Sequence, residues 1–553
     1  MNSKYTKAPN DIRTLLQSYV IKTEDGLEFS KENVPEEVSL LYKELEDASF
    51  IINKVAISDY KRVRDLFVSL DKKLTVFVGD NGYGKTTILE ALFIALSWFR
   101  ANVQKEDKSG FHIKDGDINN HNDVNYAAIT AHFKLKNITS NILVTRVKDG
   151  VSQKRNNELL SIKEMASFFR VVNSYYDDVS LPVLAYYSVS RSSNGAGIDN
   201  KRNINNSVRR WTKLDAYEDI EFDRRDFGEF LNWFIFVNNK ALSEESLIPK
   251  QERDQLVIDI SKLKVSLEVL KSFRDVDRRT IIDIETQIAN KELNLNTLPS
   301  ALNVDGVSRS KDIVANVKKA IINFLPEISS VDLQYTENEV RLVLAKDDLL
   351  LDAQQLSQGE KTILTLVGDL TRRLVLLNPG LNNPLQGKGI VLIDEIDLHL
   401  HPSWQQNIIE KLQHTFPNIQ FIITTHSPQI VSTVPSKCLR ILEEIKNPST
   451  GEKELRVLLP SSQTKGTKNS YALLYGMKTD PIPSVKEVAW LSTYKKLIEN
   501  RLQDSDEAIM IRKKLDKHYG VDHPLLLECD GIIRVLKLKD KVQGGPRNKG
   551  SEQ

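Results

Sequence analysis

A glycine-rich turn between an apolar strand and an apolar helix constrains this chain more than any other feature. The run 74–79, LTVFVG, leads into GDNGYGKTT, and a second apolar run covers residues 88–99. The spacing fits G-x-x-x-x-G-K-[ST], in which N–H groups hold phosphates, the lysine reaches the β- and γ-phosphates, and the hydroxyl ligates Mg²⁺. The pattern predicts a nucleoside-triphosphate site made by Gly79, Asp80, Asn81, Gly82, Tyr83, Gly84, Lys85, Thr86 and Thr87.

An acidic pair follows a second buried strand. Residues 389–395, GIVLIDE, are continuously apolar until Asp394 and Glu395, and such runs are typical of buried parallel strands. Next to a phosphate-binding turn, Asp394 is expected to hold Mg²⁺ together with Thr86. Glu395 is expected to accept a proton from the attacking water as general base.

Two further motifs complete the set. Residues 356–361, LSQGEK, open an apolar helix, so Ser357 and the backbone at Gly359 lie at a helix N-terminus, which attracts a γ-phosphate. Alone, the same segment would serve as an ordinary helix cap. His426 ends the apolar run 419–426 and either hydrogen-bonds a γ-phosphate or is a satisfied histidine at the rim.

The order of these four motifs resembles that of ABC-type ATPases of the SMC and RecF kind, over residues 50–460. The resemblance implies an α/β ATPase head, ATP and Mg²⁺ as cofactors, and two sites completed only when two heads meet face to face. It also implies that Ser357 and Gly359 act on the ATP held by the other head. Asp397 would then signal across the dimer, and His426 would be the switch histidine.

One position departs from this family pattern. Such heads have a glutamine at the end of the strand seen here as residues 181–191, where the sequence reads YYSVSR. Either Ser188 or Arg191 replaces it, or the glutamine comes from elsewhere, for which Gln104 and Gln153 are badly placed.

Other segments resemble the PtuA ATPases of Septu-type and retron-associated antiviral systems: DEIDLHLHPSWQ (394–405), YALLYGMKTDPIP (471–483) and a short helical insertion. The resemblance implies a companion HNH nuclease, assembly beyond a dimer and, in a retron, a reverse transcriptase with its RNA–DNA product. The function expected from it is ATP-driven dimerisation of heads that controls a partner nuclease. A nucleotide-gated scaffold with little turnover and a RecF-like DNA-repair ATPase are the alternatives.

Changes of pattern divide the chain into six segments. Leucines and isoleucines at heptad spacing predict a helical hairpin, or two amphipathic helices packed on the head. Near the C-terminus the chain is expected to be helical, and Ser484 and Glu487 have capping-box spacing. The expected segments are a lead-in 1–49, a first head lobe 50–206, the helical insertion 207–300, a second head lobe 301–460, a helical partner-docking region 461–540 and a disordered tail 541–553.

Composition narrows the class of protein. The 553 residues carry 76 basic and 75 acidic side chains, so a net charge of +1 provides no overall basic field for nucleic acid. Cys438 and Cys529 lack metal-ligand spacing and predict reduced thiols in a cytoplasmic protein. The run 88–99 is too short to span a membrane. Glu528 and Asp530 resemble the first strand of a TOPRIM nuclease, but only 23 residues follow, so no nuclease site is expected.

Overall fold

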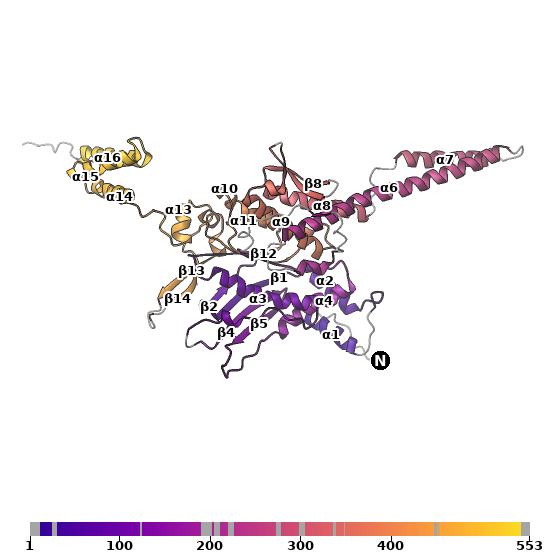
Figure 1. Ribbon diagram of the computed structural model, residues 1–553, viewed down its shortest axis with the longest axis horizontal. Helices are drawn as coiled ribbons and strands as arrows, with labels where there is room; N and C mark the ends of the chain where they lie inside the picture. Colours follow the sequence, from indigo (N-terminus) through magenta and orange to yellow (C-terminus); the bar gives the residue numbers. More distant parts are fainter. Residues whose placement is uncertain are drawn as a thin grey trace, which may run out of the picture. The chain divides into compact units, whose positions relative to one another are not determined.

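The computed structural model (Figure 1) divides into two compact units, Met1–Met477 and Lys478–Gln553. Of the expected tail 541–553, only residues 541–543 are described, and they are helical. The structure describes residues 12–24, 30–121, 124–189, 202–203, 211–218, 226–272, 278–297, 305–335, 339–347, 349–446, 451 and 453–543.

A six-stranded sheet of order β14-β13-β3-β12-β11-β6 organises the first unit. The five strands from β13 to β6 are parallel, and β14 pairs antiparallel with β13. Every residue of β3, β6, β11 and β12 is buried, which is why these strands are continuous apolar runs in the sequence. The strands are β3 (Leu74–Val78), β6 (Val183–Tyr187), β11 (Gly389–Ile393), β12 (Ile419–Thr424), β13 (Leu439–Lys446) and β14 (Lys453–Leu458).

A second, antiparallel sheet has the order β2-β1-β4-β5. Helix α3 (Lys85–Gln104) packs against strands of both sheets and is buried along most of its length. None of the described helices is long and apolar enough to cross a membrane. This layer contains β1 (Phe50–Tyr60), β2 (Val63–Ser69), β4 (Tyr126–Leu135) and β5 (Ile138–Val147), with α1 (Ile12–Glu24), α2 (Glu36–Asp47) and α4 (Leu160–Tyr175).

A third sheet precedes helix α9 (Gln358–Leu377) in the chain. Its order is β10-β9-β7, and β8 also pairs with β9. Because β10 is followed after a short turn by α9, this sheet sets where the helix begins. The strands are β7 (Arg202–Asn203), β8 (Ile328–Tyr335), β9 (Glu339–Lys346) and β10 (Leu349–Asp352).

The inserted helices form a hairpin (Figure 1). Ile260 and Ile288, which belong to the heptad pattern, are both buried. The expected architecture is confirmed: an α/β head with an inserted helical hairpin and a helical C-terminal region. Helices α6 (Asp226–Ser272) and α7 (Arg278–Thr297) run antiparallel, as their ion pairs Asp259–Lys291, Lys264–Glu292 and Lys271–Glu285 indicate.

The first turns of α6 belong to the head. Phe230, Trp233 and Phe234 are buried in its hydrophobic core. Helix α8 (Asp305–Phe324) packs against both α6 and α9. The part of the insertion that leaves the head is therefore shorter than the expected segment 207–300.

The head also extends beyond residue 460, where the sequence placed its end. Thr464 Oγ1 donates a hydrogen bond of 2.8 Å to the carbonyl oxygen of Val434. The short helix η7 (Ala472–Gly476) packs against α12 (Pro428–Val431). Residues 461–477 therefore complete the first unit.

The second unit is a bundle of three helices. They are α14 (Lys486–Glu499), α15 (Asp506–Tyr519) and α16 (Pro524–Gln543). The predicted capping box is wrong, because α14 follows Val485 and lacks a side-chain cap. The bundle packs around Tyr494, Ile498, Ala508, Ile511, Leu515, Leu526 and Cys529.

Glu528 and Asp530, which resembled a TOPRIM strand in sequence, lie on helix α16. Asp530 Oδ2 accepts a hydrogen bond of 3.0 Å from Arg512 on α15. This ion pair joins two helices of the bundle, so the carboxylate has a structural partner.

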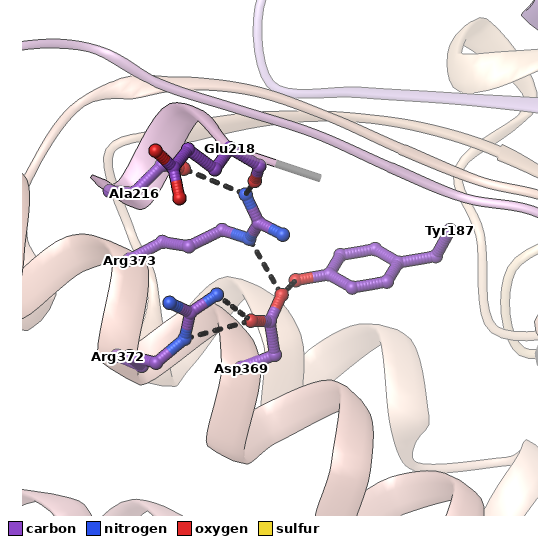
Figure 2. Close-up of polar contacts among 6 residues, drawn as sticks. All are labelled: Tyr187, Ala216, Glu218, Asp369, Arg372 and Arg373. Carbon is purple, nitrogen blue, oxygen red and sulfur yellow. Dashed lines mark hydrogen bonds and ion pairs between the residues drawn. The ribbon is translucent and has the colours of Figure 1, made fainter. Parts of the chain in front are cut away.

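A buried ion network anchors α9 to the central sheet (Figure 2). The Asp369 carboxylate accepts hydrogen bonds from Arg372 Nη2 (2.7 Å), from Arg373 Nε (2.6 Å) and from the Tyr187 hydroxyl at the end of β6 (3.0 Å). Burial alone would raise the pKa of Asp369, but the two guanidinium groups outweigh it and hold that pKa below its ordinary value.

The same network fixes the segment that leads into the hairpin. Arg373 Nη1 donates to the carbonyl oxygens of Ala216 (2.7 Å) and Glu218 (3.2 Å). Arg372 lies over the Trp211 ring, 5.5 Å from its centroid. Helix α9, strand β6 and residues 211–218 are therefore tied together by buried charges.

We expect Asp369→Ala to lower the free energy of unfolding of the first unit by about 3–5 kcal/mol, because it leaves two buried arginines without their carboxylate. Chemical denaturation followed by tryptophan fluorescence measures this change. Glu285→Ala is the control, since it breaks the exposed pair with Lys271, which is worth about 0–1 kcal/mol. Equal effects of the two substitutions would contradict a stabilising role for the buried network.

Candidate nucleotide site

The glycine-rich turn connects β3 to the first residue of α3. Gly79 and Gly84 have φ of 153° and 80°, values that other residues rarely adopt. A Cβ atom at Gly79 would lie 2.7 Å from the carbonyl oxygen of Leu442 on β13, so no side chain fits there. The turn therefore needs glycine at both ends, and it delivers the chain to a helix N-terminus, whose free N–H groups attract phosphate.

Lys85 folds back over this turn. Its Nζ donates hydrogen bonds to the carbonyl oxygens of Gly79 (2.8 Å) and Asp80 (2.9 Å). Burial lowers the pKa of Lys85, and the nearby carboxylates of Glu395 and Asp394 act in the opposite direction. The ammonium group thus lies between the glycine-rich turn and the acidic pair.

Thr86 and Asp394 are in direct contact although they are distant in the sequence. The Thr86 hydroxyl donates a hydrogen bond of 2.8 Å to Asp394 Oδ2. Asp394 is fully buried at the end of β11. A hydroxyl and a carboxylate side by side are the hard oxygen ligands that Mg²⁺ prefers, so this donor set fits the predicted metal.

Glu395 follows Asp394 in an uncommon backbone conformation, with φ of 43°. Its N–H donates a hydrogen bond of 2.7 Å to the hydroxyl of Thr424, the last residue of β12. Because β11 and β12 are parallel neighbours, their carboxyl ends meet at one edge. The acidic pair and the segment 424–427 are therefore adjacent.

His426 and Asp397 lie together at this edge. Asp397 Oδ1 accepts hydrogen bonds from the Thr425 hydroxyl (2.6 Å) and from the His426 N–H (3.3 Å). Burial, and then the positive charge of Lys85, lower the pKa of His426. The imidazole is therefore neutral at pH 7 and can donate or accept a hydrogen bond.

Ser357 and Gly359 lie at the start of α9, as predicted. Ser357 Oγ accepts from the Glu360 N–H (3.3 Å), and Glu360 Oε2 accepts from the Ser357 N–H (2.7 Å), a complete capping box. A Cβ atom at Gly359 would lie 2.6 Å from the carbonyl oxygen of His399, so only glycine allows this approach. The helix start is thereby fixed against the loop that follows the acidic pair.

The strand that lacks the expected glutamine ends at Tyr187. Tyr187 pairs with Ile393, and the N–H of Asp394 donates to the Tyr187 carbonyl oxygen (2.8 Å). Ser188 therefore follows next to Asp394, while Arg191 lies outside the described residues. Which residue takes the place of the glutamine stays a prediction.

The contacts of two residues in this region were not predicted from the sequence. Thr424 belongs to the motif 424–427 that ends with Ser427, but only the structure shows its contacts with Asp394 and Glu395. Arg62 comes from the turn between β1 and β2, and its Nη1 lies 2.9 Å from where a Cβ of Gly82 would be. Arg62 also forms an ion pair with Glu444 of β13. Neither could be found from local spacing, because their partners are remote in the chain.

Comparison with known proteins places this site in a family. The AAA ATPase domain matches residues 51–431. The "Retron Ec83 probable ATPase" of Escherichia coli is 32% identical over 502 residues, covering 88% of this chain and 87% of that protein. The "Retron Vc95 probable ATPase" of Vibrio cholerae serotype O1 biovar El Tor is 30% identical over 482 residues, covering 86% and 88%.

A shorter similarity links the chain to a second group. The "Septu protein PtuA" of Bacillus mycoides (strain KBAB4) is 42% identical over 113 residues, which cover 20% of this chain and 15% of that protein. The family match spans the glycine-rich turn, the LSQGE segment, the acidic pair and His426 together. The chain therefore belongs to the AAA ATPase domain family, together with the retron ATPases, and is similar to Septu PtuA over part of its length.

Proposed function

We propose that this chain is the ATP-binding and ATP-hydrolysing subunit of an antiphage defence complex, in which ATP-driven dimerisation of heads controls a partner nuclease. The observation that carries the proposal is the meeting of Lys85, Thr86, Asp394, Glu395 and His426 at one edge of the central sheet. The relatives named for retrons and Septu, matched over most of the chain or over part of it, supply the setting.

The residues of this edge have complementary roles in the proposal. The turn 79–87 cradles the phosphates through N–H groups, and Lys85 moves from its carbonyl partners to the β- and γ-phosphates. Thr86 and Asp394 would hold Mg²⁺, which neutralises phosphate charge when it is bound. Glu395 accepts the proton of the attacking water, and neutral His426 donates a hydrogen bond to the γ-phosphate.

The second half of each site comes from another copy of the chain. The N-terminus of α9, with Ser357 and the backbone at Gly359, faces the γ-phosphate held by the partner head, where its N–H groups and helix dipole attract negative charge. Asp397, held by Thr425 and the His426 N–H, reports closure across the dimer.

The setting that we propose is cytoplasmic. The bundle α14–α16 is the docking region for an HNH nuclease, in assemblies larger than a dimer. In a retron, a reverse transcriptase with its RNA–DNA product is a further partner. In this proposal the nuclease chemistry belongs to the partner.

Removing the Lys85 ammonium should abolish tight ATP binding. We expect Lys85→Ala to weaken ATP affinity by about 10²-fold or more, because charge-assisted hydrogen bonds to phosphate contribute about 1.5–3 kcal/mol each. Calorimetry with ATP and Mg²⁺ measures this, with Lys262→Ala on the exposed face of α6 as the control. A Lys85→Ala protein that binds ATP normally and functions would refute the proposed site.

Replacing the proposed general base should separate ATP binding from hydrolysis. We expect Glu395→Gln to slow turnover by about 10²–10⁴-fold and to accumulate ATP-bound dimers, seen by sizing chromatography with light scattering. Normal turnover would show that the base is misassigned. In a phage-protection assay, a hydrolysis-driven timer loses its function in this variant, whereas a nucleotide-gated scaffold keeps it.

Mixing two inactive variants tests whether Ser357 acts on the partner's ATP. We expect Ser357→Arg to spare ATP binding and to block closure, so that neither it nor Lys85→Ala hydrolyses ATP alone. A mixed dimer contains one site with both residues intact, and mixing should restore part of the ATPase activity. If mixing restores nothing while each variant still forms dimers with wild-type protein, Ser357 does not act across the interface.

A further inference from the structure

Glu395 has a backbone conformation that its proposed role as general base does not explain. Its φ of 43° lies in the left-handed region, where a residue with a Cβ is strained. Such a conformation persists only where surrounding contacts impose it. Something in the fold must therefore hold this residue in place.

Thr424 supplies several of the contacts that hold this turn. Thr424 accepts the Glu395 N–H on its hydroxyl oxygen (2.7 Å) and the Ile396 N–H on its carbonyl oxygen (3.1 Å). Its hydroxyl also donates a hydrogen bond to Asp394 Oδ1. Thr424 is fully buried. Asp394, Glu395 and Ile396 are thus all hydrogen-bonded to Thr424, through its hydroxyl or its backbone carbonyl oxygen.

The chemistry of the hydroxyl sets the direction of these bonds. The Glu395 N–H can only donate, so the Thr424 oxygen accepts from it, and the hydroxyl proton is left for Asp394 Oδ1. The other carboxylate oxygen of Asp394 accepts from Thr86. Both carboxylate oxygens of Asp394 are therefore hydrogen-bonded to threonine hydroxyls.

The Glu395 carboxylate lies near two other residues of the proposed site. Its negative charge acts on both Lys85 and His426, opposing the lowering of their pKa values by burial. A small rotation at the Glu395 backbone would move this carboxylate relative to the attacking water. General-base catalysis is sensitive to such displacements.

We propose that Thr424 is a positioning residue for ATP hydrolysis: it clamps the Asp394–Ile396 turn so that the Glu395 carboxylate meets the attacking water. The inference rests on the proposed role of Glu395 as general base. Thr424 does not itself touch the nucleotide. It acts through Glu395, and its removal affects turnover more than ATP affinity.

Thr424→Val tests this in the full-length chain, because valine keeps the shape of threonine and removes only the hydroxyl. We expect kcat for ATP to fall by about 10–10²-fold, since misplacement of a base by ~1 Å costs up to about 10²-fold. KM and the affinity for ATP with Mg²⁺, measured by calorimetry, should change by less than about threefold. A threonine that only fills space predicts an unchanged kcat, and that result would overturn the inference.

Two further variants serve as controls. Thr424→Ser retains the hydroxyl and should keep kcat within about threefold of wild type. Thr371→Val is a matched substitution on α9: Thr371 is fully buried, and its hydroxyl has no hydrogen-bond partner among the described residues, so kcat should not change. If Thr424→Val does not fold, Thr424→Cys carries the same prediction, because a thiol is a weak donor and a weak acceptor.

A double substitution tests whether Thr424 affects turnover through Glu395. If Thr424 acts through Glu395, Thr424→Val should slow Glu395→Gln by less than about threefold, because the positioned carboxylate is already gone. If the two losses multiply, Thr424 acts by another route and the inference is wrong. Normal turnover by Glu395→Gln would instead overturn the proposed base. A slow Glu395→Gln with a normal Thr424→Val would overturn only the inference drawn here.

Discussion

A chain of hydrogen bonds at the carboxyl edge of the central sheet, buried at Asp394 and Thr424, connects the parts of the candidate site. It runs from the Thr86 hydroxyl at the start of α3 to Asp394 at the end of β11, and on to Thr424 at the end of β12. Three elements that are remote in the sequence are thereby held together. In the proposed function, this chain of bonds and the pairing of the strands set the spacing of the glycine-rich turn, the acidic pair and His426.

A second buried network connects this edge to the rest of the head. Tyr187 ends β6 and directly precedes Ser188, which lies beside Asp394. The Tyr187 hydroxyl donates a hydrogen bond to Asp369 on α9. Through Arg373, the network continues to residues 216–218 (Figure 2). Buried polar contacts therefore tie together three parts of the head: helix α9, strand β6 and residues 216–218.

The sequence predicted the parts of the fold whose signals are local. Strands β3, β11 and β12 are buried on both faces, so their apolar runs and the motifs after them could be read directly. The contact of Thr424 with Asp394 and that of Tyr187 with Asp369 could not, because the partners lie 30 and 182 residues apart and no periodicity marks such contacts. The capping box predicted at Ser484 was wrong because helix α14 starts one residue later than expected, after Val485. The head extends beyond residue 460 because Thr464 hydrogen-bonds to Val434 and η7 packs against α12.

A structure of the Glu395→Gln protein with ATP and Mg²⁺ tests the central claim most directly. We expect two ATP molecules per dimer, each with its γ-phosphate in hydrogen-bond contact with Lys85 of one protomer and with the α9 N-terminus at Ser357 of the other. ATP held by a single chain, with Ser357 of every protomer out of reach of the γ-phosphate, would contradict it.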